Sequence, residues 1–313
     1  MSTQTIPVLV EVAVGGGALT VAEADRVAEA AQEAGVTALR LLDTLGERST
    51  VEATLAAAYL AGRHDRLGFL ADASTTRNAP YNLARRVLSV DRAAAGRLGL
   101  LLHPGSGDEV SDATTPDTTA TVAGERWSEY AGLLARLWES FPREALLGDA
   151  ERALLVDDAL IAAVGHEGRY YRVAGPLDGP TSLQGRPVVA ADARELGWDE
   201  LATGADVVVV DADRADGAAA LSAALERVGR RRSDVALLGR IPVAATEGAG
   251  RLLDRLAGHD LDGLVLVPPG GADGALAVIR HLVPQLSPSP AEPTLRAGLG
   301  LTPVAARLTE AVA

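Results

Sequence analysis

The chain lacks cysteine, and this absence excludes disulfides, thiolate metal sites and cysteine nucleophiles. Aromatic residues make up only 3% of it, a small share for a protein that stacks on planar rings. No apolar run approaches the ~20 residues that a membrane-spanning helix needs. The formal net charge is −13 and no extended basic block is present, so we expect neither nucleic acid nor an anionic membrane as a partner.

The remaining composition is that of one large globular domain. Of the 313 residues, 48% are apolar, enough to bury a single core, and α/β barrels of this length are often one domain. Residues 1–7 are polar and contain no apolar stretch of the signal-peptide type. We therefore expect a cytoplasmic protein whose residues 1–313 form a single domain.

Short apolar runs alternate with helical patterns eight times along the chain. The predicted strands are 8–14, 36–42, 67–71, 98–102, 187–191, 207–210, 235–238 and 264–267. The predicted helices are 21–34, 50–61, 82–95, 125–141, 199–203, 217–229, 247–256 and 274–282. Thr20 and Glu23 form the capping box of the first helix, which ends before Gly35. Eight strand–helix units predict an α/β fold, a closed (β/α)8 TIM barrel.

A doubly wound open sheet is the alternative fold. That fold carries a glycine-rich fingerprint after its first strand, whereas residues 15–17 are three consecutive glycines without GxGxxG spacing and predict only a turn. The barrel is therefore favoured.

Two insertions and a tail interrupt the repeat. Residues 104–124 are polar and rich in Ser, Thr, Asp and Pro, which predicts a mobile loop at the end of the fourth strand, on the face where barrel active sites lie. Residues 143–186 form a second insertion, expected on the same side, in which 166–173 alternate like an edge strand. The extension 287–313 begins extended, and its weakly amphipathic end predicts packing on a neighbouring subunit, in a homodimer or larger assembly.

Three stretches carry a family resemblance. They read STT at 74–76 with APYNLARR at 79–86, ERW at 125–127 with LWES at 137–140, and HxGxYYxVxGPL at 166–177 running into QGRPVV at 184–189. In this order they resemble the nitrilotriacetate and alkanesulfonate type of FMN-dependent monooxygenase, within the luciferase-like superfamily, over residues 8–302.

The resemblance implies an oxidoreductase chemistry. Members of this family take reduced FMN from a separate flavin reductase and use O2 to oxygenate a small organic substrate, and they need no metal. The flavin ring lies over the carboxyl-terminal mouth of the barrel, and the loops after the fourth and fifth strands hold its phosphate. The sequence leaves the choice between FMN and a deazaflavin open, and it does not identify the substrate.

Two residues at strand ends are candidate catalytic groups. Asp72 takes the place of a family Thr at the end of the third strand, where a carboxylate disfavours an anionic reduced ring unless it is protonated or paired. His103 ends the fourth strand at the mouth, where an imidazole can transfer protons. Each also has a plain structural interpretation, as a solvated Asp and a packed His. Ser74, in the motif that follows the third strand, is a candidate cofactor contact.

Several flavin contacts of the family are replaced. In the fourth strand and its loop, a family Asn and Thr become Leu101 and Pro104. In the fourth helix, a family His and Tyr become Ala123 and Trp127, while Arg126 is retained. Arg126 and Trp127 are therefore candidate cofactor contacts, with a surface salt bridge as the alternative role for Arg126.

The turn after the fifth strand departs furthest from the family pattern. The family has Gln-Ala-Gly-x-Ser, whose small residues let backbone N–H groups reach phosphate, whereas this chain has AADAR at 190–194. Asp192 repels a phosphate, and Arg194 either attracts one or neutralises Asp192. Both are candidate cofactor-binding residues.

Two functions are therefore open. One is a flavin-dependent monooxygenase whose phosphate site is rebuilt around Arg126 and Arg194. The other is a non-catalytic relative that keeps the barrel, has lost the flavin, and acts as a partner subunit or a small-molecule binder. The replaced contacts predict weak or absent FMN binding by the isolated protein.

Overall fold

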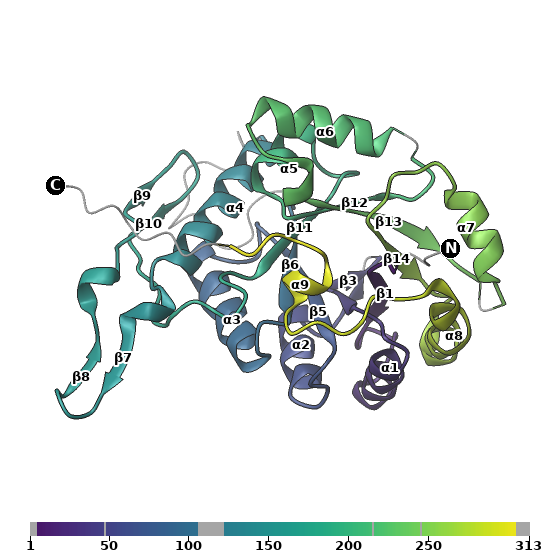
Figure 1. Ribbon diagram of the computed structural model, residues 1–313, viewed down its shortest axis with the longest axis horizontal. Helices are drawn as coiled ribbons and strands as arrows, with labels where there is room; N and C mark the ends of the chain where they lie inside the picture. The colour runs from purple at the N-terminus through teal and green to yellow at the C-terminus, as the bar shows by residue number, and fades with distance from the viewer. Residues whose placement is uncertain (1–4, 47, 106–121, 215, 245, 305–313) are drawn as a thin grey trace.

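The computed structural model describes residues 5–46, 48–105, 122–214, 216–244 and 246–304. Eight parallel strands close into a barrel, in the order β1-β14-β13-β12-β11-β6-β5-β2, with helices around the outside (Figure 1). The strands are β1 (Val8–Ala13), β2 (Ala38–Leu42), β5 (Gly68–Ser74), β6 (Leu98–His103), β11 (Val188–Asp192), β12 (Val207–Asp211), β13 (Ala236–Pro242) and β14 (Gly263–Val267). The predicted closed barrel is confirmed, and the open sheet is wrong.

The helices follow the strands as predicted, within a few residues at their ends. They are α1 (Val21–Glu33), α2 (Ala53–Ala61), α3 (Pro80–Ala93), α4 (Ala123–Glu139), α5 (Trp198–Gly204), α6 (Gly217–Arg227), α7 (Ala249–Leu256) and α8 (Gly271–Ala277). The capping box is confirmed: the backbone N–H of Glu23 donates to Thr20 Oγ1 at 3.2 Å, and the backbone N–H of Thr20 donates to Glu23 Oε2 at 2.8 Å. The predicted loop 104–124 ends before Ala123, where α4 already begins. Residues 106–121 of this loop lie outside the described residues, so its predicted mobility stays a prediction.

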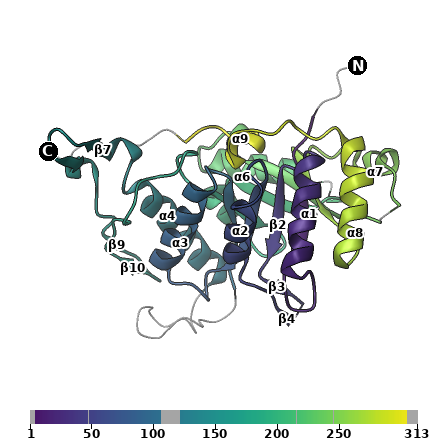
Figure 2. The same cartoon turned by 90° about the horizontal axis from the view of Figure 1, so that it is seen from below.

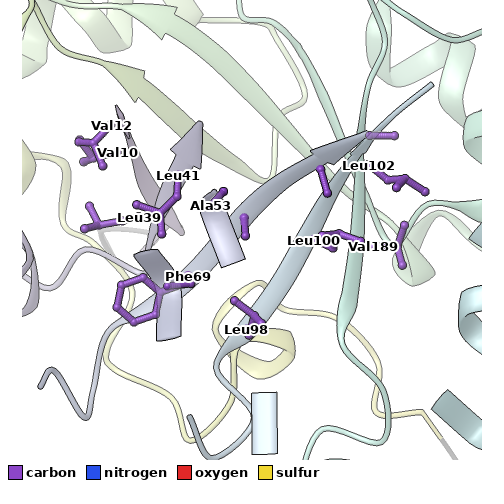
Figure 3. Close-up of a cluster of buried hydrophobic side chains, with 14 of the residues drawn as sticks. Val10, Val12, Leu39, Leu41, Ala53, Phe69, Leu98, Leu100, Leu102 and Val189 are labelled. Carbon is purple, nitrogen blue, oxygen red and sulfur yellow. The ribbon is translucent and has the colours of Figure 1, made fainter. Parts of the chain in front are cut away.

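The barrel has two apolar layers. The outer one lies between the strands and the helices and includes Val10, Leu39, Phe69 and Leu100 (Figure 3). The inner one fills the amino-terminal half of the barrel interior. Its strand residues are Leu9, Ala38, Leu70, Leu101, Val188, Ala190, Val207, Val209, Ala236, Leu238 and Val265.

The C-terminal segment covers the amino-terminal end of the barrel interior, below this inner layer. The short helix α9 (Leu295–Gly298) and the residues after it add Leu295, Leu299 and Leu301 to the inner cluster. The sequence predicts that the tail packs on a neighbouring subunit. In the structure these three leucines are buried in the chain's own barrel, which removes their apolar surface from water, and packing of the tail on a neighbouring subunit stays a prediction. Residues 305–313 lie outside the described residues.

The second insertion forms two hairpins on the outside of the barrel. One pairs β7 (Leu146–Asp149) with β8 (Leu154–Val156), and the other pairs β9 (His166–Glu167) with β10 (Arg172–Val173). The predicted single edge strand over 166–173 is wrong, because a turn that is closed by Gly168 N–H and Tyr171 O breaks it. The insertion lies beside α3 and α4 (Figures 1 and 2). Arg169 of the β9–β10 hairpin contacts Glu125 in the first turn of α4, on the predicted carboxyl-terminal side, whereas Leu177 contacts Ser140 at the opposite end of that helix.

Smaller features complete the fold. A short hairpin of β3 (Thr44–Leu45) and β4 (Arg48–Ser49) follows β2 at the carboxyl-terminal face. Within the described ranges, no helix is long and apolar enough to cross a membrane.

Candidate functional site

Charged side chains form one layer at the carboxyl ends of the strands. Residues two apart in a strand point to the same face, so the position two after an inward apolar residue also faces the interior. On seven strands this position is charged. The layer consists of Glu11, Arg40, Asp72, His103, Asp192, Asp211 and Arg240. The barrel interior therefore changes from apolar to ionic as it approaches the mouth.

Arg40 is the buried centre of this layer. Its guanidinium donates from Nε to Asp72 Oδ1 at 3.0 Å and from Nη2 to Asp72 Oδ2 at 2.9 Å. Its Nη1 donates to Glu11 Oε2 at 3.1 Å, and Arg240 binds the same carboxylate from the other side at 2.8 and 2.9 Å. Burial raises the pKa of the Asp72 carboxyl, but the charge of Arg40 and the hydrogen bond with His103 outweigh it and hold that pKa below its usual range. Asp72 is therefore an anion.

His103 lies between two carboxylates. Its Nε2 is 3.0 Å from Asp72 Oδ2, and its Nδ1 is 2.8 Å from Glu195 Oε2. Burial lowers the pKa of the imidazole, but hydrogen bonds to Asp72 and Glu195 outweigh it and raise that pKa to about 10. His103 is consequently an imidazolium near neutral pH, with both ring nitrogens donating.

An ion pair between Asp192, at the end of β11, and Arg194 stabilises the turn after this strand. The carboxylate of Asp192 is 1% exposed and accepts from the backbone N–H and the guanidinium of Arg194. Burial raises the pKa of Asp192, but the hydrogen bonds from Arg194 outweigh it and hold that pKa below its usual range. Arg194 also lies 3.9 Å from Asp211. The backbone N–H of Glu195 donates to the carbonyl of Asp192, and this turn directs the Glu195 side chain onto His103.

These contacts link the charged side chains into a continuous series of ion pairs around the mouth, in which cations and anions alternate. Its members, in order, are Arg240, Glu11, Arg40, Asp72, His103 and Glu195. They come from β13, β1, β2, β5, β6 and the turn after β11, so the series of ion pairs joins strands that are far apart in sequence. We call these six residues the mouth network.

A pocket of about 240 Å³ lies over part of this network. Its walls are Asp43, Thr44, Asp72, Ser74, Thr76, Arg77, His103, Gly105 and Glu195. The hydroxyls of Ser74 and Thr76 are hydrogen-bonded to each other at 2.8 Å. Gly105 must be glycine, because its φ is +64° and a Cβ there would be 2.4 Å from the hydroxyl oxygens of Ser74 and Thr76.

Two candidate residues lie behind the pocket wall. Arg126 is 3% exposed, and its Nη2 donates to the carbonyl of Pro104 at 2.7 Å and of Gly105 at 3.3 Å. Trp127 is fully buried, and its indole N–H donates to the carbonyl of Leu102 at 2.7 Å. Both side chains fasten α4 to the end of β6.

The structure thus brings Asp72, Ser74 and His103 together in the pocket. Asp192 ends the neighbouring strand β11 and Arg194 lies in the turn after it, whereas Arg126 and Trp127 lie apart from the pocket. Sequence reasoning missed four members of the mouth network. They are Glu11, Arg40, Glu195 and Arg240. For the three strand residues among them, the available signal was a charge two residues after an inward apolar residue. Among the described residues, no group of acidic and histidine side chains is arranged to hold a metal.

The fold and this site define a class: a (β/α)8 barrel with a polar pocket at the carboxyl ends of its strands, where barrel enzymes carry out their chemistry. The sequence profile of the luciferase-like monooxygenases matches residues 5–268, and the chain belongs to that family. The resemblance inferred from the motifs is therefore confirmed. Members of this family use reduced flavin that separate reductases supply.

Individual relatives support the same assignment. The chain is 29% identical over 300 residues to one of the subunits of pristinamycin IIA synthase from Streptomyces pristinaespiralis, covering 95% of each protein. It is 29% identical to nitrilotriacetate monooxygenase component A of Aminobacter aminovorans, over 61% of this chain and 44% of that protein. The EDTA monooxygenase of Chelativorans sp. BNC1 has the same fold, with a TM-score of 0.77 and 18% identity, over 96% of this chain and 99% of that one.

Proposed function

We propose that this chain is the oxygenase component of a two-component flavin monooxygenase, which acts on a small organic molecule bound at the barrel mouth. Family membership over residues 5–268 supports the reaction class and a flavin reductase as partner. The observation that carries the location is the pocket formed by Asp72, Ser74, His103 and Glu195 at the carboxyl ends of the strands. A homodimer or larger assembly remains a prediction.

In this proposal His103 is the proton donor, and Asp72 is the carboxylate that keeps it protonated. The imidazolium of His103 can donate a proton to a bound molecule, and Asp72 and Glu195 keep it charged and fix its orientation. Arg40 holds Asp72 in place from below and is a positioning residue. The apolar layer beneath the network keeps water out of the barrel.

The phosphate of FMN does not fit the candidate residues as they stand. Arg194 is bound by Asp192, Arg126 is buried against backbone carbonyls, and Trp127 is buried against Leu102. A phosphate gains roughly 1.5–3 kcal/mol from each charge-assisted hydrogen bond, so a site whose cations are already engaged binds it weakly. The candidate residues of this chain therefore do not form a phosphate site in this arrangement.

A second candidate function is a partner subunit whose flavin is held by another chain. It is based on two observations. The Asp192–Arg194 pair closes the turn that follows the fifth barrel strand, and the relative that matches over 95% of both lengths is named as one subunit of a synthase.

One experiment tests the proposal and separates the two candidates. The purified chain is titrated with oxidised FMN and, anaerobically, with reduced FMN, and oxygen-dependent product formation is then measured with a flavin reductase and a panel of small organic substrates. Turnover by this chain alone supports the oxygenase. No turnover alone, but turnover after a flavin-binding homologue is added, supports the partner subunit and contradicts the oxygenase.

A further inference from the structure

The network carries one feature that neither function requires. Glu195 differs from the other members because it comes from a turn, while the rest come from barrel strands. Its side chain is also more exposed, at 37%, against 5% for Asp72 and 3% for Arg40. Both carboxylate oxygens lie on one nitrogen of His103, at 2.8 and 3.0 Å. Glu195 therefore binds the imidazolium of His103 in the way that the carboxylate of a separate ligand would bind it.

Within the mouth network and the pocket wall, the charges balance when Glu195 is in place. Among the described residues of the network and the pocket wall, the four cations are Arg40, Arg77, His103 and Arg240. The four carboxylates are Glu11, Asp43, Asp72 and Glu195. With Glu195 turned away, the network keeps one uncompensated positive charge, and the Nδ1 of His103, whose side chain is 24% exposed, loses its anionic partner. A carboxylate of a ligand can replace that partner through a charge-assisted hydrogen bond.

We propose that the Nδ1 side of His103 is a binding site for a carboxylate group of a small ligand, and that Glu195 occupies this site as an internal substitute until the ligand displaces it. The proposal rests on the proposed function and names a chemical class for its substrate, a small organic acid. The pocket of about 240 Å³ beside His103, with the hydroxyls of Thr44 and Ser74 in its wall, has room for the remainder of such a molecule.

Displacement is feasible because the Glu195–His103 pair is only partly buried. Exposed ion pairs contribute little net stability, since water solvates the separated charges. Asp72 cannot exchange in the same way, because it is buried and held by two hydrogen bonds from Arg40. The two carboxylates on His103 therefore have different roles, with Asp72 fixed and Glu195 exchangeable.

The test is a binding measurement without flavin, oxygen or reductase. Acetate and propionate are titrated into the wild-type chain and into E195Q by calorimetry, with acetamide and propionamide as neutral probes of the same size. E226Q, which changes an exposed glutamate on α6, is the matched control. E195Q removes the internal competitor, so both carboxylates should bind about tenfold more tightly, the free energy of roughly one charge-assisted hydrogen bond. The amides should show no gain.

Two further variants test the roles of the Glu195 carboxylate and of His103. E195D retains a carboxylate and should show no more than part of the gain, whereas H103Q combined with E195Q should abolish it. In NMR of ¹⁵N-histidine-labelled E195Q, acetate should shift the Nδ1 signal of His103. Equal affinity of wild type and E195Q for acetate, an equal gain for acetamide, or a gain that survives H103Q would overturn the proposal. Because these readouts contain no oxygenation step, a failure of the proposed function would leave them unchanged.

Discussion

The guanidinium of Arg40 grips the carboxylate of Asp72 through two parallel hydrogen bonds of 3.0 and 2.9 Å, with both side chains almost fully buried. This bidentate geometry is the strongest form of the arginine–carboxylate contact. It joins β2 to β5 inside the barrel and keeps the Asp72 carboxylate, which contacts His103 Nε2, negatively charged. Asp72 therefore connects the buried part of the mouth network, around Arg40, to its more exposed part, around His103.

Replacing Asp72 should destabilise the fold strongly. D72N leaves Arg40 and His103 with one partner fewer in a buried place, and the loss of one member of a buried ion pair costs about 3 kcal/mol or more. The free energy of unfolding from urea denaturation measures the effect.

D199N is the matched control, because the Asp199–Arg227 pair is on the surface and should contribute less than about 1 kcal/mol. Equal stability of D72N and D199N would show that the buried pair adds nothing.

The stability of the protein should depend on pH through His103. The folded state raises the pKa of this imidazole from 6.5 to about 10, so the protonated form stabilises the fold. That contribution is fully present below pH 6.5 and is lost as the pH rises through about 10. Urea denaturation of wild type and H103Q between these two pH values should show a steeper decline for the wild type. NMR titration of the His103 ring gives the pKa directly, and a value near 6.5 would contradict the hydrogen-bonded arrangement.

The Asp192–Arg194 pair should limit FMN binding. The double variant D192G/R194S removes the carboxylate that repels phosphate and restores small residues in the turn, so FMN fluorescence quenching should report tighter binding than in wild type. If the wild-type chain binds FMN at micromolar concentration and R194A abolishes this, Arg194 is the phosphate anchor.

A second buried carboxyl, Asp91, should respond to pH in its own range. Burial raises its pKa to about 6, against hydrogen bonds from Gln184 and from the backbone of Leu98 that lower it. The uncharged form favours the fold, so its contribution is present below pH 3.8 and is lost as the pH rises through about 6. D91N keeps the accepting oxygen, so its stability relative to wild type should increase as the pH rises through this range, by on the order of 3 kcal/mol at about pH 8. A constant difference between the two proteins at about pH 4 and about pH 8 would refute this.

The barrel was predictable from sequence because its physical cause is local. Parallel strands that are buried on both faces must be continuous apolar runs, such as 207–210, and the helices between them must be amphipathic. Local hydrogen-bonding patterns, such as the capping box of Thr20 and Glu23, are visible for the same reason. The position of the insertion could not be predicted, because it depends on contacts with α3 and α4 that no short-range pattern encodes.

The strand-end candidates Asp72 and His103 could be identified, but not their partners. Arg240 and Glu11 are 229 residues apart in sequence, and only closure of the barrel between β13, β14 and β1 brings them together. Arg40 resembles a misplaced charge within an apolar strand until its two carboxylate partners are known. Glu195 carried no signal, because its role depends on the path of a turn.

The mouth network also bears on how the sheet is aligned. Sliding any of its strands by one residue would turn the charge into the apolar layer beneath the helices and bring an aliphatic side chain into its place. Leucine and valine runs such as 207–210 are nearly interchangeable from one residue to the next, so hydrophobicity alone penalises such a slip weakly. An unpaired Arg40 or Glu11 among the outer aliphatic residues would be far more unfavourable. The ionic layer thus excludes misaligned barrels that the apolar layers would accept.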